Sequence, residues 1–402
     1  MQDMLELKRT LKRFNTINRL NSVLKARTQE KKAQDELDYY RHQAKIAGIH
    51  QPDEKQLRCL LQDRLRKRGI FPEGKPKGQL HIFLAYRANN WEHALPPALR
   101  SFGEVTEFEW GSLGFEDRAQ NWLTKQQEQM NLAMLSAFKQ ADKKRKVDVF
   151  IGYLSGYYIN PDILRKTAKH SAVIFNFCWD DKLGFRGHKY SGIWTGPAAL
   201  ASVVDLNLTN APDSCIKYMV EGGLAVFWPE AADLDIHKCY NVPFEYDVSF
   251  VGAKYGGRPL FIRRLQNIGI KVHCFGFGWP NGNLSNEDMV KMYSLSRINL
   301  GFAGVGQSRK LMCLKARDFE VPMSGGLYLT QDNPELALVY DVGNEIVTYN
   351  DEKECAEEIN WLLTDTDKAQ RIRTAGRKRA ITEHTWTNRF EQIFRIADLI
   401  KS

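Results

Sequence analysis

The first 68 residues carry apolar side chains at the spacing of a helix. The series begins with Leu5, Leu11, Phe14, Ile17 and Leu20. Such spacing collects the apolar side chains on one side of an α-helix. We therefore expect a basic helical extension over residues 1–75. Coiled-coil self-association is one use for its apolar side, and packing on the protein itself is the alternative.

The pattern changes at residues 69–78, where GIFPEGKPKG concentrates glycine, proline and lysine and predicts a linker. Beyond it, short apolar segments typical of strands alternate with longer amphipathic segments typical of helices. Strands are expected at 80–86, 105–110, 147–153, 171–177 and 203–208. Helices are expected at 91–102, at 117–144, after Asn160 and near Pro197.

The alternation restarts at Asp247. Strands are expected at 247–252, 271–278, 298–302, 327–330 and 345–348, and helices at 259–267, 286–296, 310–323, 351–363 and along the tail 367–402. Because each parallel neighbour in a sheet requires a crossover, this order predicts an α/β protein with two Rossmann-like domains facing a cleft. The expected domains are residues 79–245 and 246–385, and residues 386–402 form a helix that crosses back to the first.

Composition narrows the class. The chain has 402 residues, of which 43% are hydrophobic and 26% charged, as in a globular protein with a sizeable core. No apolar run approaches the roughly 18 residues of a membrane-spanning helix, and the first residues lack the apolar centre of a secretory signal. The seven cysteines include no C-x-x-C pair, which is typical of reduced thiols. We therefore expect a cytoplasmic protein without structural zinc.

Charge is concentrated in the extension. Residues 1–75 hold 18 Lys+Arg against 10 Asp+Glu, a large share of the net charge of +9 of the whole chain. Contact with a membrane surface is therefore a second use for this helix. Aromatic residues are sparse in the helical part, residues 1–68, where they stand at Phe14, Tyr39 and Tyr40, so specific recognition of nucleic acid is not expected.

The first candidate site is the loop 252–259 (GAKYGGRP), between an expected strand and an expected helix. Its glycines, the first of which is Gly252, allow close backbone approach. The exposed N–H groups, together with Lys254 and Arg258, favour an anion such as a diphosphate. The spacing is not G-x-G-x-x-G, so an ordinary glycine-rich turn is the alternative.

The second candidate site is the basic segment 309–326, expected as a helix that ends in a Gly-Gly turn. Arg317 and Glu320 are three residues apart and would share one face, and Lys310 would lie on the same side. That face offers cations for phosphate and a carboxylate for sugar hydroxyls. A solvated ion pair on the surface is the alternative.

Residues 247–392 contain DVSFVG, GFGW, EDMVKMYSLSRINL, RDFEVPMSGGLYLT, GNEIVTY and AGRKR in this order. With these motifs the sequence resembles the CgeB-like (spore-maturation-protein-like) glycosyltransferases of GT-B fold. The resemblance extends more faintly through WEHALPPALRSFGEV and VFIGYLS. It implies transfer of a sugar from a nucleotide-sugar donor, a UDP- or GDP-sugar, to a glycan, protein or small-molecule acceptor. No tightly bound metal or other cofactor is implied.

The resemblance also implies roles for residues. Glu320, followed by VPMSGG, matches the ribose-binding glutamate that many GT-B enzymes place before a glycine turn, here Gly325 and Gly326. Met312 stands where retaining members have another acidic residue, which leaves the stereochemical course open. The side chains offered to neutralise the leaving diphosphate are Lys254, Arg258, Arg309, Lys310, Lys315 and Arg317.

A base for the acceptor hydroxyl is expected on the first domain. Asp181 and Asp180 follow the expected strand 171–177, and Glu92 follows the first strand of the domain. Because the carboxyl ends of parallel strands meet at one edge, these carboxylates are the candidate catalytic residues. Capping of the following helix is the structural alternative for each of them.

Two other functions are alternatives to sugar transfer. A dinucleotide-dependent oxidoreductase requires G-x-G-x-x-G and an acidic residue about 20 positions on, and neither first strand is followed by this fingerprint. A non-catalytic scaffold that binds nucleotide or sugar and assembles through its helical extension stays open, because Met312 replaces an acidic residue.

Overall fold

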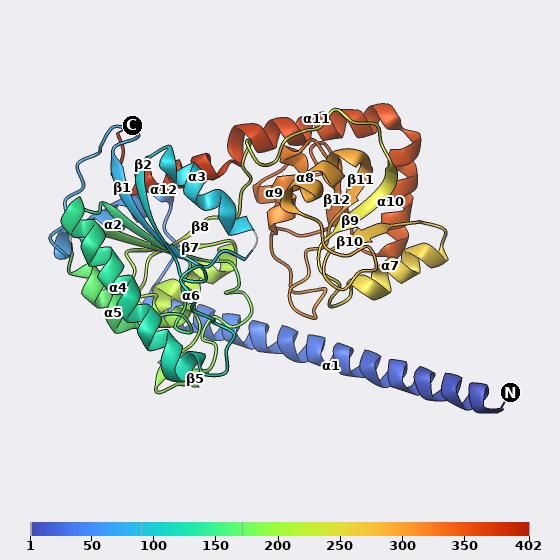
Figure 1. Ribbon diagram of the computed structural model, residues 1–402, viewed down its shortest axis with the longest axis horizontal. Coiled ribbons are helices and arrows are strands. Elements are labelled where there is room, and N and C mark those ends of the chain that lie inside the picture. Colours follow the sequence, from blue (N-terminus) through green and yellow to red (C-terminus); the bar gives the residue numbers. More distant parts are fainter. Residues whose placement is uncertain (1, 90, 171, 402) are drawn as a thin grey trace. The chain divides into compact units, whose positions relative to one another are not determined.

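The computed structural model describes residues 2–89, 91–170 and 172–401, with side chains described from residue 23 on. The chain divides into two compact units, each with its own parallel sheet (Figure 1). The five-stranded unit comprises Met1–Glu36 and Lys238–Lys378, and the six-stranded unit comprises Leu37–His237 and Arg379–Ser402. Of the helices in the described part of the chain, none combines the length and the apolar character that a membrane crossing requires.

The six-stranded unit has a fully parallel sheet of order β2-β1-β3-β4-β7-β8. In the register of the sheet, Ile82 of β1 lies opposite Val105 of β2 and Val149 of β3. A short antiparallel hairpin, β5 (Lys189–Tyr190) and β6 (Ile193–Trp194), stands apart from the sheet. The sheet strands are β1 (Leu80–Tyr86), β2 (Gly103–Glu109), β3 (Val149–Gly152), β4 (Val173–Cys178), β7 (Leu206–Thr209) and β8 (Ala225–Phe227).

Helices cover both faces of this sheet, because its strands are apolar on both sides. Along β1, Ile82 and Leu84 belong to the core cluster with α2 (Glu54–Lys67), α3 (Leu95–Arg100) and α12 (Trp386–Ile396). The alternate residues Phe83 and Ala85 belong to the cluster with α4 (Gln127–Lys144) and α5 (Pro161–Ala168). This period of two is what a strand buried on both faces requires.

Much of the expected extension is part of the six-stranded unit. Leu57, Leu61 and Leu65 of α2 are buried in the core cluster of the sheet. Tyr40, in the second half of α1 (Gln2–Ala47), is fully buried and packs edge-to-face on Phe185. These four apolar side chains therefore pack on the protein itself. Coiled-coil association through the rest of α1 stays a prediction. Leu5, Leu11, Phe14, Ile17 and Leu20 lie outside the residues with described side chains.

The five-stranded unit has a parallel sheet of order β10-β9-β11-β12-β13. Its strands are β9 (Tyr246–Val251), β10 (His273–Phe275), β11 (Ser296–Leu300), β12 (Tyr328–Gln331) and β13 (Val347–Tyr349). Helices α7 (Arg258–Asn267), α10 (Glu352–Thr364) and α11 (Thr366–Glu383) supply buried side chains to one core cluster. Helices α8 (Asn286–Leu295) and α9 (Ala316–Met323) contact each other. Helix α8 also contacts β9 and β11, and α9 contacts β12.

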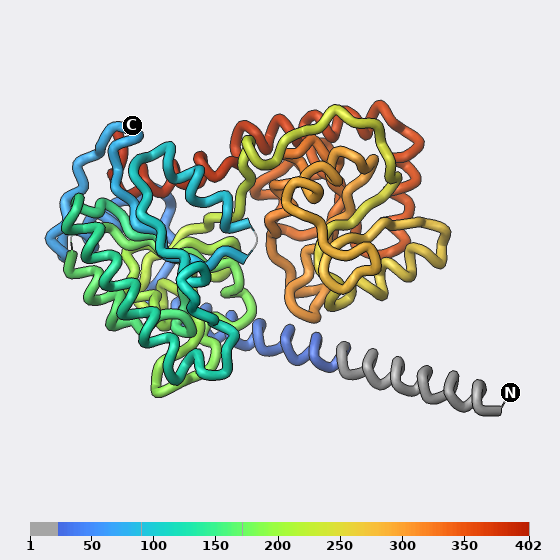
Figure 2. The backbone as a smooth tube through the Cα atoms, in the orientation of Figure 1, coloured from blue at the N-terminus to red at the C-terminus, as the bar shows by residue number. Residues whose placement is uncertain are grey.

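Most of the expected strands and helices recur, and the main differences follow; the course of the chain can be traced in Figure 2. The expected helix 310–323 begins only at Ala316, because Ser308 and Asp318 bind backbone N–H groups before it. The expected tail is two helices, since Thr385 caps the start of α12 by accepting from Asn388 N–H. Helix α6 (Cys215–Val220) and strand β8 were not expected.

Both sheets share one strand order. When the strands of each sheet are numbered in the order of the sequence, their order across the sheet is 2-1-3-4-5. The larger sheet has a sixth strand after the fifth. The order reverses between β1 and β3 in one unit and between β9 and β11 in the other. At such a point the loops that leave neighbouring strands turn to opposite faces, and ligands of α/β proteins bind in the resulting crevice.

Candidate functional site

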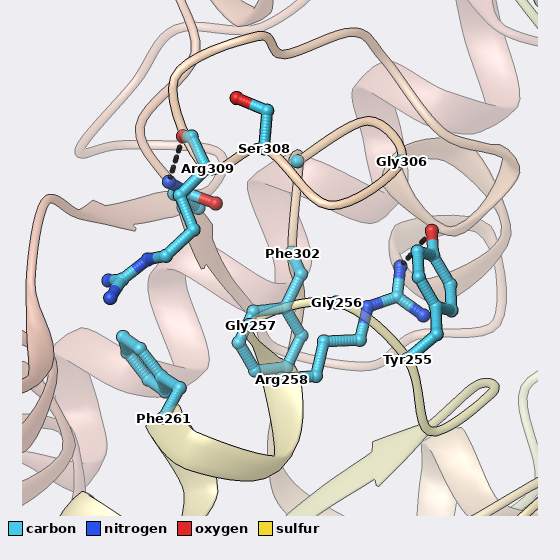
Figure 3. A pocket seen from close by; sticks show the side chains of 11 residues that line it. Tyr255, Gly256, Gly257, Arg258, Phe261, Phe302, Gly306, Ser308 and Arg309 are labelled. Atoms are coloured by element: carbon cyan, nitrogen blue, oxygen red, sulfur yellow. Dashed lines mark hydrogen bonds between the residues drawn. The ribbon is translucent and has the colours of Figure 1, made fainter. Parts of the chain in front are cut away.

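The switch point of the five-stranded unit is lined by two loops that contain glycines. Residues 252–257 connect β9 to α7, and residues 301–315 connect β11 to α9. A small pocket lies between them, with Tyr255, Arg258, Phe302 and Arg309 among its lining residues (Figure 3). The pocket is therefore at the edge of the sheet where a ligand is expected from topology alone.

Glycines allow the two loops to approach each other and the neighbouring helix. Gly256 has a φ of 59°, and a Cβ there would lie 2.9 Å from the carbonyl oxygen of Gly306. A Cβ at Gly252 would lie 3.0 Å from an Nη of Arg317. A larger residue at Gly256 would push the two loops apart, and one at Gly252 would displace the side chains of Phe250 and Arg317.

Arg258 begins α7 and is buried, with 6% of its surface exposed. Its guanidinium donates to the carbonyl oxygen of Ala253 and to the hydroxyl of Tyr255, both at 3.0 Å, and stacks 4.1 Å from the centre of the Tyr255 ring. Burial and the nearby charge of Arg317 lower the pKa of Arg258 to about 10. The two arginines therefore lie close enough to repel each other.

Arg317, in the first turn of α9, completes this pair of cations. Its guanidinium lies 5.5 Å from the centre of the Phe250 ring. Burial works against its charge, but the tyrosines Tyr328 and Tyr293 and the carboxylate of Glu320 raise its pKa overall. Its Nε is buried and has no hydrogen-bond partner among the described residues.

Glu320 lies one turn after Arg317 on α9 and is 5% exposed. Burial and the charge of Glu320 raise the pKa of Tyr293 well above its usual value. The start of the helix is fixed by Asp318, which accepts from Lys315 N–H and from the Tyr328 hydroxyl, each at 2.7 Å. The alternative of a solvated surface ion pair between Arg317 and Glu320 is therefore wrong, because the carboxylate is inside the protein.

Not all of the other cationic side chains predicted for this site point toward Arg258 and Arg317. Arg309 lines the pocket, but its guanidinium points away from Arg258 and pairs with Glu352 at 3.0 Å (Figure 3). Lys254 is exposed and lies 5.2 Å from the centre of the Trp279 ring. Lys310 is exposed, and it cannot share a helical face with Arg317 because α9 begins at Ala316.

Three further residues predicted here support the framework of the site. The Nζ of Lys315 lies 2.9 Å from the sulfur of Cys313. Gly325 has a φ of 74° in the turn after α9, a conformation that glycine adopts without strain. A Cβ at Gly326 would lie 2.7 Å from the amide nitrogen of Asn299. This turn sets the position at which β12 enters the sheet.

The carboxylates predicted as bases lie in the six-stranded unit, in different surroundings. Asp180 is exposed two residues after β4, and the Tyr153 hydroxyl donates to it at 3.3 Å. Asp181 is fully buried and accepts from the Tyr218 hydroxyl at 2.8 Å. Burial raises the pKa of Asp181 to about 6, against the lowering effect of Lys217. Glu92 is 4% exposed and accepts from the backbone N–H of Asn89.

Aromatic side chains surround this edge of the larger sheet. Trp91, Tyr153 and Trp179 lie with ring centres 4.3 to 5.6 Å apart, and Trp179 continues into a stack with Trp228. The Trp179 indole donates to the carbonyl oxygen of Trp228 at 3.0 Å. The carboxylates of this edge could be predicted from the sequence, but the aromatic cluster could not, because its members are separated by tens of residues.

Metal ligands were not expected. Within the described residues, no group of three or more His, Cys, Asp or Glu side chains is placed to hold a metal ion. The groups that gather at the switch point of the five-stranded unit are cations, which suit an anionic ligand rather than a metal.

Comparison with known proteins agrees with this geometry. Residues 258–395 match a family described as glycosyl transferase-like. No curated protein gives a significant match. Among solved structures, a sucrose-phosphate synthase from Thermosynechococcus elongatus is similar, with a TM-score of 0.57 and 13% sequence identity. The match covers 79% of this chain and 98% of the synthase chain.

Two further structures show the same fold. Anabaena HepE, solved in complex with UDP and glucose, has a TM-score of 0.56 at 11% identity, covering 79% of this chain and 99% of its own. A glycosyltransferase from Rickettsia africae has a TM-score of 0.56 at 11% identity, covering 79% of this chain and 98% of its own. Residues 258–395 therefore match the glycosyl transferase-like family, and the chain has the fold of the GT-B glycosyltransferases.

Proposed function

We propose that the protein transfers a sugar from a nucleoside diphosphate donor to a hydroxyl group of an acceptor, and that the donor diphosphate binds between Arg258 and Arg317. The observation that carries the proposal is this pair of arginines at the switch point of the five-stranded unit, with the buried Nε of Arg317 unbonded. The resemblance of residues 247–392 to CgeB-like glycosyltransferases supports the same assignment and points to that subfamily.

An anion between the arginines would resolve an unfavourable arrangement. Two guanidinium groups in partly buried surroundings repel each other, and the hydrogen bonds of Arg258 go to neutral oxygens. A diphosphate would place negative charge between the two guanidinium groups and would give the buried Nε of Arg317 an acceptor. The amino end of α7, which follows Gly257, adds N–H groups and a partial positive charge. The same groups would stabilise the diphosphate as it leaves the sugar.

Glu320 is proposed to bind the ribose of the donor. A buried carboxylate that accepts from two sugar hydroxyls holds a nucleotide in a fixed orientation. Glu320 is buried one helical turn beyond Arg317, so one ligand could contact both side chains. UDP is the first donor nucleotide to test, since HepE was solved with UDP and glucose.

Asp180 is the carboxylate that we propose as the base. In the reaction, the acceptor oxygen forms a bond to the anomeric carbon while the bond from that carbon to the diphosphate oxygen breaks, and the hydroxyl proton passes to the carboxylate. Asp180 is exposed and oriented by Tyr153, whereas Asp181 and Glu92 are buried. We therefore assign Asp181 a structural role: it holds Tyr218 in place by accepting a hydrogen bond from its hydroxyl.

The experiment is calorimetric titration with a panel of nucleoside diphosphates. Wild-type protein should bind at least one of them, and Arg317→Ala should weaken that affinity by about ten- to a hundredfold, since a hydrogen bond to a charged group is lost. Lys291→Ala, an exposed lysine on α8, is the matched control and should bind as wild type does. Wild-type protein that binds no member of the panel would refute the proposal.

Turnover separates an enzyme from a binding scaffold. Wild-type protein given sugar-labelled donors should release free sugar slowly or transfer it to a supplied acceptor. Binding of nucleotide without release or transfer from any donor would favour the non-catalytic scaffold instead.

A further inference from the structure

Helix α1 contacts the loop that closes the pocket. The backbone N–H of Gln307 donates to the side-chain oxygen of Gln29 at 2.9 Å. The hydroxyl of Ser308 donates to the carboxylate of Glu30 at 2.5 Å. Both pairs lie 278 positions apart in sequence and within the five-stranded unit.

The contact with Glu30 completes the bonding of Ser308. A serine hydroxyl has one proton to donate and two lone pairs to accept with. Here the proton goes to Glu30, while the lone pairs accept from the N–H groups of Lys310 at 3.0 Å and Leu311 at 2.8 Å. Ser308 is 4% exposed, so water does not readily replace a lost partner. The turn of the loop thus depends on an acceptor supplied by α1.

The same loop forms one wall of the pocket. The carbonyl oxygen of Gly306 faces Gly256 of the opposite loop, and the carbonyl oxygen of Arg309 accepts from the Gln331 side chain at 2.9 Å (Figure 3). Gly306, Ser308 and Arg309 all line the pocket. A change in the turn at Ser308 would therefore move the wall that faces the start of α7.

We propose that Glu30 and Gln29 are positioning residues for the anion site: α1 holds the loop 304–311 in the conformation that binds the diphosphate. The inference rests on the proposed function for its ligand and adds to it a role for the helical extension. Preorganisation of a loop raises affinity because the ordering cost is met before the ligand binds. The role belongs to the hydrogen-bond acceptor of Glu30 rather than to its charge, because a carboxylate beside the pocket would by itself repel an anion.

The test compares Glu30→Ala, Glu30→Gln and Lys31→Ala in the full-length protein. Hydrogen–deuterium exchange of the loop 304–311 is measured without ligand, and affinity is measured with inorganic pyrophosphate, which carries the shared chemistry of all candidate donors. Glu30→Ala should speed exchange in the loop and weaken pyrophosphate binding by about tenfold. Glu30→Gln keeps an acceptor and should stay within about threefold of wild type. Lys31→Ala, an exposed neighbour, should match wild type.

Three outcomes would overturn the inference. Unchanged loop exchange in Glu30→Ala would mean that α1 does not hold the loop. Faster exchange with unchanged pyrophosphate affinity would mean that the loop conformation does not matter for the anion. Tighter binding by both Glu30 variants would assign Glu30 an inhibitory charge. Wild-type protein that binds neither pyrophosphate nor any nucleoside diphosphate would instead refute the proposed function, while the exchange result would still report on the contact.

Discussion

The two units have the same strand order but contrasting side chains at their switch points. In the five-stranded unit, two glycine-containing loops follow β9 and β11, and the first turns of the helices after these loops carry Arg258 and Arg317, which lie close to each other. In the six-stranded unit, the strand ends carry Trp91, Tyr153 and an exposed carboxylate, Asp180. We therefore propose that the first switch point binds an anion, and that the second binds a hydroxyl-bearing molecule and accepts its proton.

The difference teaches that the fold sets where a ligand binds and the loops set which ligand binds. The residues that distinguish the units lie outside the strands, after the positions that build the sheets. Buried carboxyl groups occur in both units, at Asp181 and at Asp318, and burial raises the pKa of each to about 6. Burial of a carboxylate alone thus does not mark the base, and accessibility separates Asp180 from these two.

The largest expected effect is on turnover. Asp180→Asn should lower kcat for sugar transfer by about a hundredfold to ten-thousandfold, because the base is lost, and should leave nucleotide affinity unchanged. Steady-state kinetics and calorimetry measure the two quantities. Glu128→Gln, an exposed carboxylate of the same unit, is the control. A kcat for Asp180→Asn within a few-fold of wild type would remove Asp180 from the mechanism.

The aromatic cluster of the six-stranded unit is expected to stabilise its core. Trp228 is fully buried, packs on Trp179 and Trp386 and donates to the carbonyl oxygen of Arg389 at 2.9 Å. Trp228→Ala should lower the free energy of unfolding by about 3 to 5 kcal/mol, measured in urea. The control Trp361→Ala changes a partly exposed tryptophan and should cost far less. Equal losses in the two variants would contradict this view of the cluster.

The raised pKa of Asp181 predicts a pH dependence of stability. Because its pKa is about 6 in the folded protein and 3.8 ordinarily, the folded state holds the proton more tightly. The stability that this group contributes is fully present below the unfolded-state value and is lost as the pH rises through 6. Between pH 4 and pH 8, Asp181→Asn should gain up to about 3 kcal/mol relative to wild type. A difference that does not vary with pH would mean that Asp181 is ionised in the fold.

The smallest expected effect concerns the ribose. Glu320→Gln should weaken UDP binding by about tenfold, because a charge-assisted hydrogen bond becomes a neutral one. The variant and wild type should bind a 2′,3′-dideoxy nucleoside diphosphate equally, since the hydroxyl partners are missing. If the substitution weakens both ligands alike, Glu320 acts on the fold of the site rather than on the ribose.

The sequence predicted most of the architecture and part of the site. Apolar residues at a period of two and glycines at the ends of helices are local signals, so most strands of both sheets could be predicted from the sequence, whereas β8 could not. The start of α9 could not, because Ser308 and Asp318 reorganise the backbone between positions 308 and 316. The contact of Glu30 with Ser308 joins residues 278 positions apart, and no local pattern marks it. Burial likewise separated Asp180 from Asp181, neighbours that sequence alone treats alike.

The most direct test is a crystal structure of the protein with UDP. We predict diphosphate oxygens within hydrogen-bond distance of both Arg258 and Arg317, and ribose hydroxyls that donate to the carboxylate of Glu320. A nucleotide bound elsewhere, with the two guanidinium groups unchanged and Glu320 in contact with protein alone, would contradict this prediction.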